Sequence, residues 1–469
     1  MKKKKHKNKG LRFKNLDQLE QINLNAAGID IGAEEHYVAV PKGRDPEGED
    51  VRHFHTFTAD LLNIAEWLKS CAIDTVAMES TGVYWIPLFE ILDSQGFDVK
   101  LVNPRFIKNV PGRKTDVVDC QWIQQLHTYG LLQGAFRPDD KICELRSYLR
   151  QRSMLTSYAS QHIQHMQKAL EQMNIKLSHV ITDITGATGM RIIRSILVGE
   201  RDPEALARMR NPQCKSSESE IAKSLQGNWR SEHLFALQQA VDLYDFYKSK
   251  IIACESRIHA CLETFEDRSD GTSLPKSSNR SSGSRHKFHF DARTSLYRMT
   301  GVDLTKIDGI DTPTALTIIG EIGIDMSKWP TDKHFSSWLA LCPGSKVSGG
   351  KVLSSKSKPS ANRAAHAFRL AAYSLHNSKS ALGAFLRRKK SHLGSPKAIT
   401  ATAHKIARIF YNMLKYGSKY VDLGQDYYER CYRERVIANL KRKAKQLGYD
   451  IVNVKELENF TTSYNVAVT

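Results

Sequence analysis

Gly-Ile-Asp-Ile-Gly at residues 28–32 is an apolar stretch that carries one acidic residue, which is the pattern of a short buried strand. This strand is predicted to cover residues 24–31. The elements that follow are predicted as strands over 36–40, 52–57, 74–79 and 98–103 and as helices over 61–69, 85–95 and 116–129. Three strands followed by alternating helices and strands predict an α/β domain with a mixed sheet over residues 21–138.

Four acidic residues stand where this layout brings side chains together. Asp30 lies in the first strand, Glu79 ends the fourth, and Asp116 and Asp119 lie three residues apart at the start of a helix. Carboxylates at strand ends and on one helix face can converge on a single point. They repel one another unless cations neutralise them, and their hard oxygen atoms suit Mg²⁺. A turn or a helix cap is the ordinary explanation of each acid alone, so the hypothesis depends on their joint placement.

The composition points to a large basic protein with a polyanionic partner. The chain has 469 residues, too many for one core, and a formal net charge of +19. Nucleic acid is the commonest partner of such a chain, although a solubilising surface explains the charge as well. Eight scattered cysteines without a Cys-x-x-Cys pair indicate neither a zinc site nor a disulfide framework, and they fit a reducing cytoplasm. Without an apolar run of about 18 residues, no membrane span is predicted.

The rest of the sequence is predicted to be mostly helical and to divide into segments of different composition. Residues 1–20 form a disordered basic arm without the apolar stretch of a signal peptide. Residues 139–265 contain two long helical patterns, which predict an antiparallel hairpin or an intermolecular coiled coil. A flexible Ser- and Arg-rich linker is expected over 266–294, an all-helical domain over 295–420 and a basic helical tail over 421–469.

Two loops in the C-terminal half have the composition of phosphate-contacting turns. Ile-Asp-Gly-Ile at residues 307–310 has the form of a helix–hairpin–helix, in which Gly309 lets backbone N–H groups approach a phosphate. Ser348 lies in a lysine-rich loop and is followed by two glycines. Because these neighbours are small, a phosphate can approach the Ser348 hydroxyl, which could then act as a nucleophile. An ordinary packing turn explains the first loop as well, and a phosphate-binding turn without a nucleophile explains the second.

Basic residues cluster beside these candidate sites. We expect nucleic-acid contacts from Gly309 and from members of the clusters, namely Arg105, Arg113, Lys114, Lys351, Arg363, Arg387 and Arg388. A solvated face is the ordinary explanation of any one cluster, whereas three clusters beside three loops are what a nucleic-acid channel requires. His162 and His165, which lie on a helical stripe, are interpreted as packing residues rather than metal ligands.

At these residues the chain resembles the DEDD-type transposases of insertion-sequence family one-ten, the bridge-RNA-guided recombinases. The resemblance rests on the acid-bearing motifs at 28–32, 78–82 and 112–119. It is reinforced by Asp-Gly-Ile at 308–310, Leu-Cys-Pro-Gly at 341–344 and Ser-Gly-Gly-Lys at 348–351. The motifs keep the family order over most of the chain, and the departures are a Ser-rich insertion, a long middle region and a long tail.

The resemblance implies an N-terminal RNase H-like (RuvC-like) domain, a coiled-coil region and a helical C-terminal transposase domain. It implies that Asp30, Glu79, Asp116 and Asp119 form a metal-binding tetrad for Mg²⁺, with two ions per site and Mn²⁺ as a substitute. It also implies that Ser348 attacks a DNA phosphate to form a covalent phosphoserine link. The implied partners are a non-coding bridge RNA, donor and target double-stranded DNA, and further copies of the chain in a tetramer built from dimers.

The resemblance therefore implies a transposase that cuts and rejoins DNA strands under RNA guidance, in the bacterial cytoplasm at the nucleoid. Two metal ions at the acids would clamp the attacking and leaving oxygens of a phosphodiester. The nearest alternative is a junction-resolving nuclease that uses the same acids with water as the nucleophile. A further alternative is a nucleic-acid-binding protein without catalytic activity.

Overall fold

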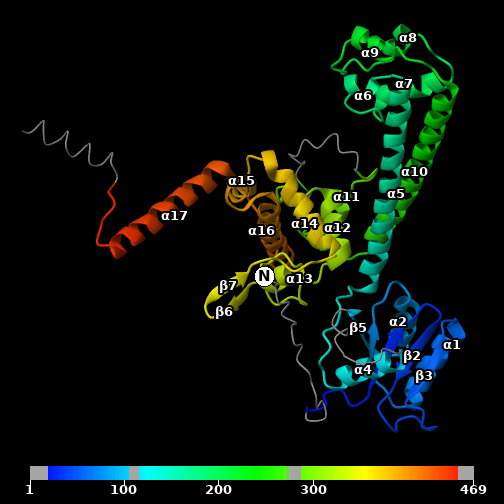
Figure 1. The fold of residues 1–469 in the computed structure, drawn as a ribbon, viewed down its shortest axis with the longest axis vertical. Coiled ribbons are helices and arrows are strands. Elements are labelled where there is room, and N and C mark those ends of the chain that lie inside the picture. The colour runs from blue at the N-terminus through cyan, green and yellow to red at the C-terminus, as the bar shows by residue number, and fades with distance from the viewer. Residues whose placement is uncertain (1–18, 105–115, 272–273, 275–286, 453–469) are drawn as a thin grey trace, which may run out of the picture. The chain divides into compact units, whose positions relative to one another are not determined.

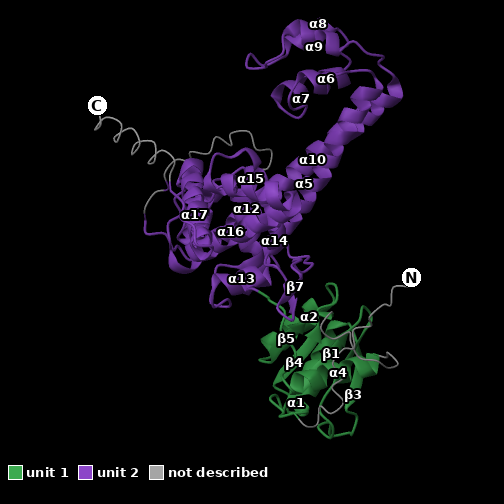
Figure 2. Cartoon of the chain, turned by 60° about the vertical axis from the view of Figure 1, so that its left-hand side comes forward, with its two compact units in different colours: residues 1–137 green, residues 138–469 purple. Residues whose placement is uncertain are grey.

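The computed structural model describes residues 19–104, 116–271, 274 and 287–452. Arg105, Arg113 and Lys114 lie outside the described residues, as do most of the expected basic arm, much of the expected linker and the end of the tail. The chain divides into two compact units, residues 1–137 and 138–469, which are coloured separately in Figure 2. The finer domain boundaries expected from the sequence stay predictions.

A five-stranded sheet forms the centre of the first unit (Figure 1). Its strands are β1 (Ala26–Ile31), β2 (Glu35–Ala39), β3 (Val51–His55), β4 (Thr75–Glu79) and β5 (Asp98–Val102). They lie in the order β3-β2-β1-β4-β5, in which β1, β2 and β3 are antiparallel neighbours whereas β1, β4 and β5 are parallel. This order agrees with an RNase H-like sheet, and it confirms the predicted mixed α/β class.

Among the described residues, helices cover both faces of this sheet. Helices α1 (Thr58–Ser70) and α2 (Trp85–Ser94) pack over one face, where Met78 of β4 is fully buried. Helix α4 (Asp116–Thr128) packs over the other face, against Ala77 of the same strand. Successive residues of a strand point to opposite faces, so a continuous apolar run such as β4 suits a sheet that is covered on both sides.

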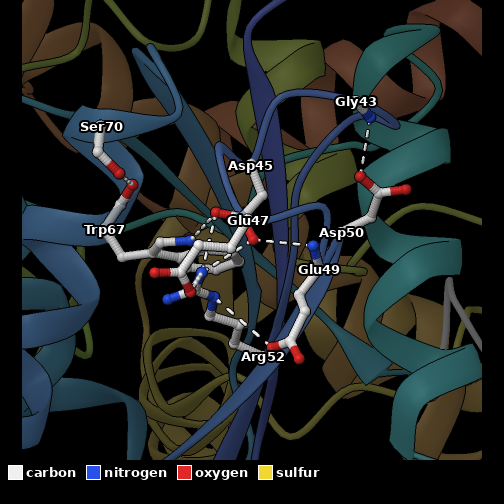
Figure 3. Close-up of polar contacts among 8 residues, drawn as sticks. All are labelled: Gly43, Asp45, Glu47, Glu49, Asp50, Arg52, Trp67 and Ser70. Atoms are coloured by element: carbon white, nitrogen blue, oxygen red, sulfur yellow. Dashed lines mark hydrogen bonds and ion pairs between the residues drawn. The ribbon is translucent and has the colours of Figure 1, made fainter.

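A buried carboxylate fixes the loop between β2 and β3 against α1 (Figure 3). The indole Nε1 of Trp67 donates a hydrogen bond to Asp45 at 3.1 Å, and the Arg52 guanidinium donates to both oxygens of Asp45, at 3.0 and 2.9 Å. Burial alone would raise the pKa of Asp45, but these hydrogen bonds outweigh it and lower the pKa to about 2. Asp45 therefore stays charged at physiological pH and keeps the loop joined to the helix.

The second unit begins with a long two-helix arm. Its helices α5 (Asp140–Gln172) and α10 (Ser231–Glu263) run antiparallel and pack together along the arm (Figure 1). A small module closes the far end of the arm and consists of α6 (Leu177–Val180), α7 (Ala187–Leu197), α8 (Pro203–Arg208) and α9 (Glu218–Ser224). Module and arm share one apolar core. Of the two arrangements predicted for this region, the antiparallel hairpin is the one formed within the chain.

Helices also form most of the remaining second unit. They are α11 (Ala292–Thr300), α12 (Thr312–Ile322), α13 (Asp332–Trp338), α14 (Arg363–Ser374), α15 (Ala381–Leu393), α16 (Ser395–Tyr416) and α17 (Gly424–Gln446), with short 3₁₀ helices η2 (Leu304–Lys306) and η3 (Leu375–Asn377). An aromatic cluster forms their core, because Phe335 lies 6.3 Å from Phe368 and 5.7 Å from Tyr411 between ring centres, and all three are almost completely buried.

A two-stranded hairpin departs from the all-helical arrangement expected over residues 295–420. Strands β6 (Lys346–Ser348) and β7 (Lys351–Ser354) pair antiparallel around Gly349 and Gly350. Both glycines have positive φ, +56° and +75°, which a tight two-residue hairpin turn requires and which glycine adopts without strain. The region is therefore mostly helical rather than all helical.

Two further sequence expectations concern membranes and thiols. Among the helices of the described ranges, none combines the length and the apolar character that a membrane crossing requires. All eight cysteines fall within those ranges and are free thiols. The thiols agree with the lack of a disulfide framework in the sequence.

Candidate active site

One cavity of the first unit is lined by all four predicted acids. It has a volume of about 620 Å³, and Asp30 of β1 and Glu79 of β4 line it from neighbouring parallel strands. Asp116 and Asp119 line it from the first turn of α4. The fold thus brings together acids from three segments that lie far apart in the sequence, while their catalytic role stays a prediction.

A glycine in β1 allows α4 to lie directly against the sheet. A Cβ atom at Gly28 would be 2.2 Å from the backbone N of Gln124 and 2.5 Å from the carbonyl oxygen of Cys120, which is too close for any side chain. The Gln124 side chain also donates a hydrogen bond to the carbonyl of Ala26 at 3.3 Å. This close crossing carries the first turn of α4 to the end of β1 that bears Asp30.

Burial beside carboxylates raises the pKa values of two residues near the acids. Burial, together with the nearby charges of Asp30 and Asp119, raises the pKa of Cys120 to about 12. Burial and the neighbouring Glu35 carboxylate likewise raise the pKa of Tyr37. Cys120, which is fully buried in α4, is therefore a neutral thiol at physiological pH.

The carboxylate of Glu79 is held by the turn that follows it. Thr81 Oγ1 donates a hydrogen bond to Glu79 Oε1 at 2.6 Å, and Thr81 itself lines the cavity. Ser80 donates its backbone N–H at 2.9 Å and its hydroxyl at 3.1 Å to the carbonyl of Val102, which ties the end of β4 to the end of β5. Thr81 therefore orients one of the four acids, a role that its position two residues after Glu79 did not reveal.

Two acids that were not predicted also line the cavity. Glu34 and Glu35 lie where the chain turns from β1 into β2, and the N–H of Gly32 donates to the carbonyl of Glu35 at 3.1 Å. Tyr37 donates its hydroxyl to the Glu35 carboxylate at 3.4 Å. The available signal was the short spacing between the first two predicted strands, which places this turn at the Asp30 end of β1.

The donors around the cavity are oxygen atoms from carboxylates and hydroxyls. Across the described residues, no group of three or more His, Cys, Asp or Glu side chains has the mutual spacing of a metal site. The four acids therefore share one cavity without forming a closed ligand set. Oxygen donors of this kind suit Mg²⁺ or Mn²⁺ rather than the metals that prefer nitrogen or sulfur.

The predicted serine lies in the second unit, at the end of β6. Ser348 pairs with Lys351 across the glycine turn, and both residues are exposed. The turn residues between them carry no side chains, so a bulky phosphate has room beside the serine hydroxyl and the lysine. Its role as a nucleophile and the phosphate contact of Lys351 stay predictions.

The predicted helix–hairpin–helix turn lies between η2 and α12. Gly309 has a φ of +86° in this turn, and a Cβ atom there would be 2.4 Å from the carbonyl oxygen of Ala371 in α14. Asp311 caps α12 by accepting a hydrogen bond from the N–H of Thr314 at 2.9 Å. Packing against α14 already explains the glycine, and its contact with nucleic acid stays a prediction.

Two arginines predicted to contact nucleic acid are engaged within the second unit. Arg387 donates hydrogen bonds to the carbonyl of Ser378 and to the side-chain oxygen of Gln425, both at 2.6 Å. The Arg388 guanidinium lies 3.3 Å from the ring centre of Tyr432. Both arginines therefore hold the first part of α17 against α15, and their contact with nucleic acid stays a prediction.

Arg363 and the histidine pair occupy different surroundings. Arg363 begins α14 and lines a second cavity of about 610 Å³, together with residues of α5 and α12. His162 stacks on Tyr247 of the facing arm helix with ring centres 5.4 Å apart, and it lies 5.5 Å from His165. These ring contacts agree with the packing interpretation of the histidines, whereas the nucleic-acid contact of Arg363 stays a prediction.

Two family models match the chain. The first is the DEDD-type IS110 model, described as a transposase, and it matches residues 27–175, a range that contains the four acids of the cavity. The second, described as the transposase IS116/IS110/IS902 family, matches residues 303–385, which include Gly309 and Ser348. A search of curated proteins found no match to the chain. The chain therefore belongs to the DEDD-type IS110 family of transposases and is an enzyme of DNA recombination.

Proposed function

We propose that this transposase moves an insertion sequence by cutting and rejoining DNA strands under the guidance of a non-coding bridge RNA. The observation that carries the proposal is the single cavity that gathers Asp30, Glu79, Asp116 and Asp119 from three elements. Acids gathered in one cavity of a chain with a net charge of +19 indicate a local site for cations. RNA guidance is supported by the family resemblance and is compatible with the basic charge.

The proposed cofactor is Mg²⁺, two ions at the four acids, with Mn²⁺ as a substitute. When bound, the metal would polarise the scissile phosphate and stabilise charge on its attacking and leaving oxygens. Asp30 and Glu79 would hold it from the sheet, and Asp116 and Asp119 from α4. The hydrogen bond from Thr81 keeps one oxygen of Glu79 in a fixed direction, so this ligand is oriented in advance.

The proposed nucleophile is the hydroxyl of Ser348. Its oxygen bonds to phosphorus while the bond between phosphorus and one DNA oxygen breaks, and the serine proton passes to that leaving oxygen. Because the phosphoserine link conserves the ester bond, a hydroxyl of a second DNA strand can attack it, release Ser348 and complete the rejoining. The acids and Ser348 belong to different compact units. The family resemblance supports a tetramer built from dimers, in which one subunit's serine acts with another's acids.

Two substitutions test the chemistry. Glu79→Gln keeps the size of the side chain but removes its charge, and Ser348→Ala removes only the hydroxyl. We expect both variants to bind DNA and RNA as the wild type does and to lose strand exchange by roughly a thousandfold or more, because each removes an essential reacting group. A denaturing gel should show protein covalently joined to DNA for the wild type and not for Ser348→Ala.

Ser345→Ala is the matched control, because it removes another hydroxyl from the same loop, and it should recombine normally. Unimpaired recombination by Ser348→Ala would contradict the nucleophile. Free cut ends without a covalent adduct would instead indicate a nuclease that uses water. Nucleic-acid binding without strand cleavage, unchanged when all four acids are replaced by alanine, would indicate a non-catalytic binding protein. RNA guidance is tested separately by sequencing RNA that co-purifies with the protein, and a lack of complementarity to the element ends and target would contradict it.

A further inference from the structure

The second half of helix α17 carries a basic surface. None of the 23 residues of α17 is buried in the described structure. Residues 435–446 contain no Asp or Glu, and their exposed basic residues are Arg435, Lys441, Arg442, Lys443 and Lys445. A cationic helix that contributes nothing to an apolar core is a candidate interaction surface.

The first half of the same helix is fixed to the rest of the second unit. Gln425 donates its backbone N–H to the carbonyl of Lys379 at 3.0 Å, and its side chain accepts a hydrogen bond from Arg387 at 2.6 Å. The Arg388 guanidinium lies over the ring of Tyr432. Figure 1 shows the rest of the helix extending beyond α15 and α16. The basic half is therefore presented on an anchored support.

Four of the basic residues share one side of the helix. Arg435 and Arg442 are seven residues apart, and Lys441 and Lys445 are four apart. At about 100° per residue, all four fall within an arc of roughly 120°. The adjoining side is partly apolar, with Ile437 42% exposed. We name the side defined by Arg435, Lys441, Arg442 and Lys445 the cationic face.

We propose that the cationic face of α17 binds the phosphate backbone of duplex DNA outside the acid cavity. Charge complementarity selects a nucleic-acid backbone, because duplex DNA carries one negative charge per about 1.7 Å of its axis and the basic half of the helix spans about 18 Å. The match to transposase families makes duplex DNA the substrate and so favours it as the occupant of this face. Contacts of lysine and arginine with phosphates hold a duplex without reading its bases. The inference rests on the chain acting on DNA as a transposase, and it adds a surface that retains the duplex during the chemistry.

A full-length variant with Arg435, Lys441, Arg442 and Lys445 all replaced by Gln tests the proposal. The probe is a labelled duplex of about 30 base pairs with an unrelated sequence, titrated at several salt concentrations. We expect the affinity to fall by about tenfold or more at moderate salt. Four lost phosphate contacts should also lower the slope of log affinity against log salt by about 3 to 4. An unchanged affinity and slope would overturn the proposal.

The matched control removes the same charge elsewhere, with Gln at four exposed lysines: Lys42, Lys215, Lys223 and Lys333. An equal loss of affinity and slope in this control would show that only the overall charge matters and would overturn the proposal. A second variant, Arg435→Lys with Arg442→Lys, keeps the charge and should bind as the wild type does. Thermal unfolding of each variant establishes that it is folded before binding is compared.

Two further measurements separate other occupants of the cationic face. Titration with RNA and a measurement of molecular mass accompany the DNA titration. A loss of affinity confined to RNA, or a loss of oligomers with DNA affinity intact, would overturn duplex DNA as the partner. The proposed function is tested independently, because Glu79→Gln should keep the wild-type salt slope while it loses strand exchange.

Discussion

The hydroxyl of Thr81 orients a carboxylate that the proposed chemistry needs. Thr81→Val keeps the branched shape of the side chain but removes the hydrogen bond to Glu79. We expect the rate of strand cleavage to fall by about 10- to 100-fold, because substitution of a group that orients a metal ligand typically lowers metal affinity or activity by this factor. Cleavage rates measured over a series of Mg²⁺ concentrations should show that the variant needs more Mg²⁺ for half-maximal activity.

Thr81→Ser is the matched control for this substitution. It keeps the hydroxyl and loses only a methyl group, so its rate and its Mg²⁺ requirement should stay close to those of the wild type. If Thr81→Val instead needs no more Mg²⁺ than the wild type, the threonine does not act through Glu79. A loss of stability without a change in Mg²⁺ requirement would identify a purely structural residue.

At the scale of elements, the contact between α4 and β1 sets the geometry of the acid cavity. Gly28→Ala places a Cβ atom against the backbone of α4, where the space is absent. We expect a loss of about 2 kcal/mol or more in the free energy of unfolding, because overpacking forces backbone shifts. Urea unfolding measures the loss, and strand cleavage should fall as well, since the helix carries Asp116 and Asp119.

Gly134→Ala is the matched control for the same change. A Cβ atom at Gly134 would meet the side chain of Lys100 at an ordinary contact distance of 3.4 Å. Its stability and activity should therefore stay close to those of the wild type. Equal stability of the Gly28 and Gly134 variants would contradict the close crossing of α4 over β1.

The helices and strands of the first unit were predictable because the spacing of their apolar residues matches the positions that are buried in the structure. β4, for example, was expected over residues 74–79 and covers Thr75–Glu79. The β6–β7 hairpin was not predicted, because its strands are exposed and so lack an apolar alternation. The local pattern that favours a hairpin is the glycine pair at its turn. From the sequence alone, we instead interpret this pair as part of a loop that a phosphate can approach.

The candidate site was predictable as far as its acids but not its supporting contacts. Asp30 and Glu79 could be placed together because neighbouring parallel strands end at the same edge of a sheet. The direction of the Thr81 side chain depends on the turn after β4, which the residue pattern does not determine. The hydrogen bond between Arg387 and Gln425 depends on where α17 packs against α15, which the sequence does not reveal. The prediction that Arg387 contacts nucleic acid rested on its charge alone.

At the scale of the whole molecule, the buried imidazole of His127 should make the stability of the first unit depend on pH. His127 of α4 is 1% exposed and lies 2.9 Å from the hydroxyl of Thr75 in β4. Burial, and then the charge of Lys100, lower the pKa of His127 from 6.5 to about 4. In the unfolded chain His127 binds a proton below pH 6.5, whereas in the folded unit it binds one only near pH 4. The free energy of unfolding therefore falls by roughly 3 kcal/mol as the pH is lowered across this range.

Thermal unfolding at a series of pH values measures this dependence. His127→Gln removes the titrating group, so its stability should fall less than that of the wild type between pH 6.5 and 4, whatever its value at neutral pH. His53→Gln is the matched control, because His53 is exposed in the same sheet, and it should follow the wild-type pH profile. Identical pH profiles for His127→Gln and the wild type would contradict the role of the buried imidazole.

The two-helix arm restricts how its own length can vary. Helices α5 and α10 have 33 residues each, which corresponds to about 50 Å. Removing one residue from either helix would rotate everything beyond it by about 100° and separate side chains that now face each other. Length changes that keep the two helices in register must therefore occur in both at once, in steps of about seven residues. Relatives with longer or shorter arms should accordingly differ by insertions or deletions that occur in both helices. The length of the arm can therefore change only in steps of about two helical turns.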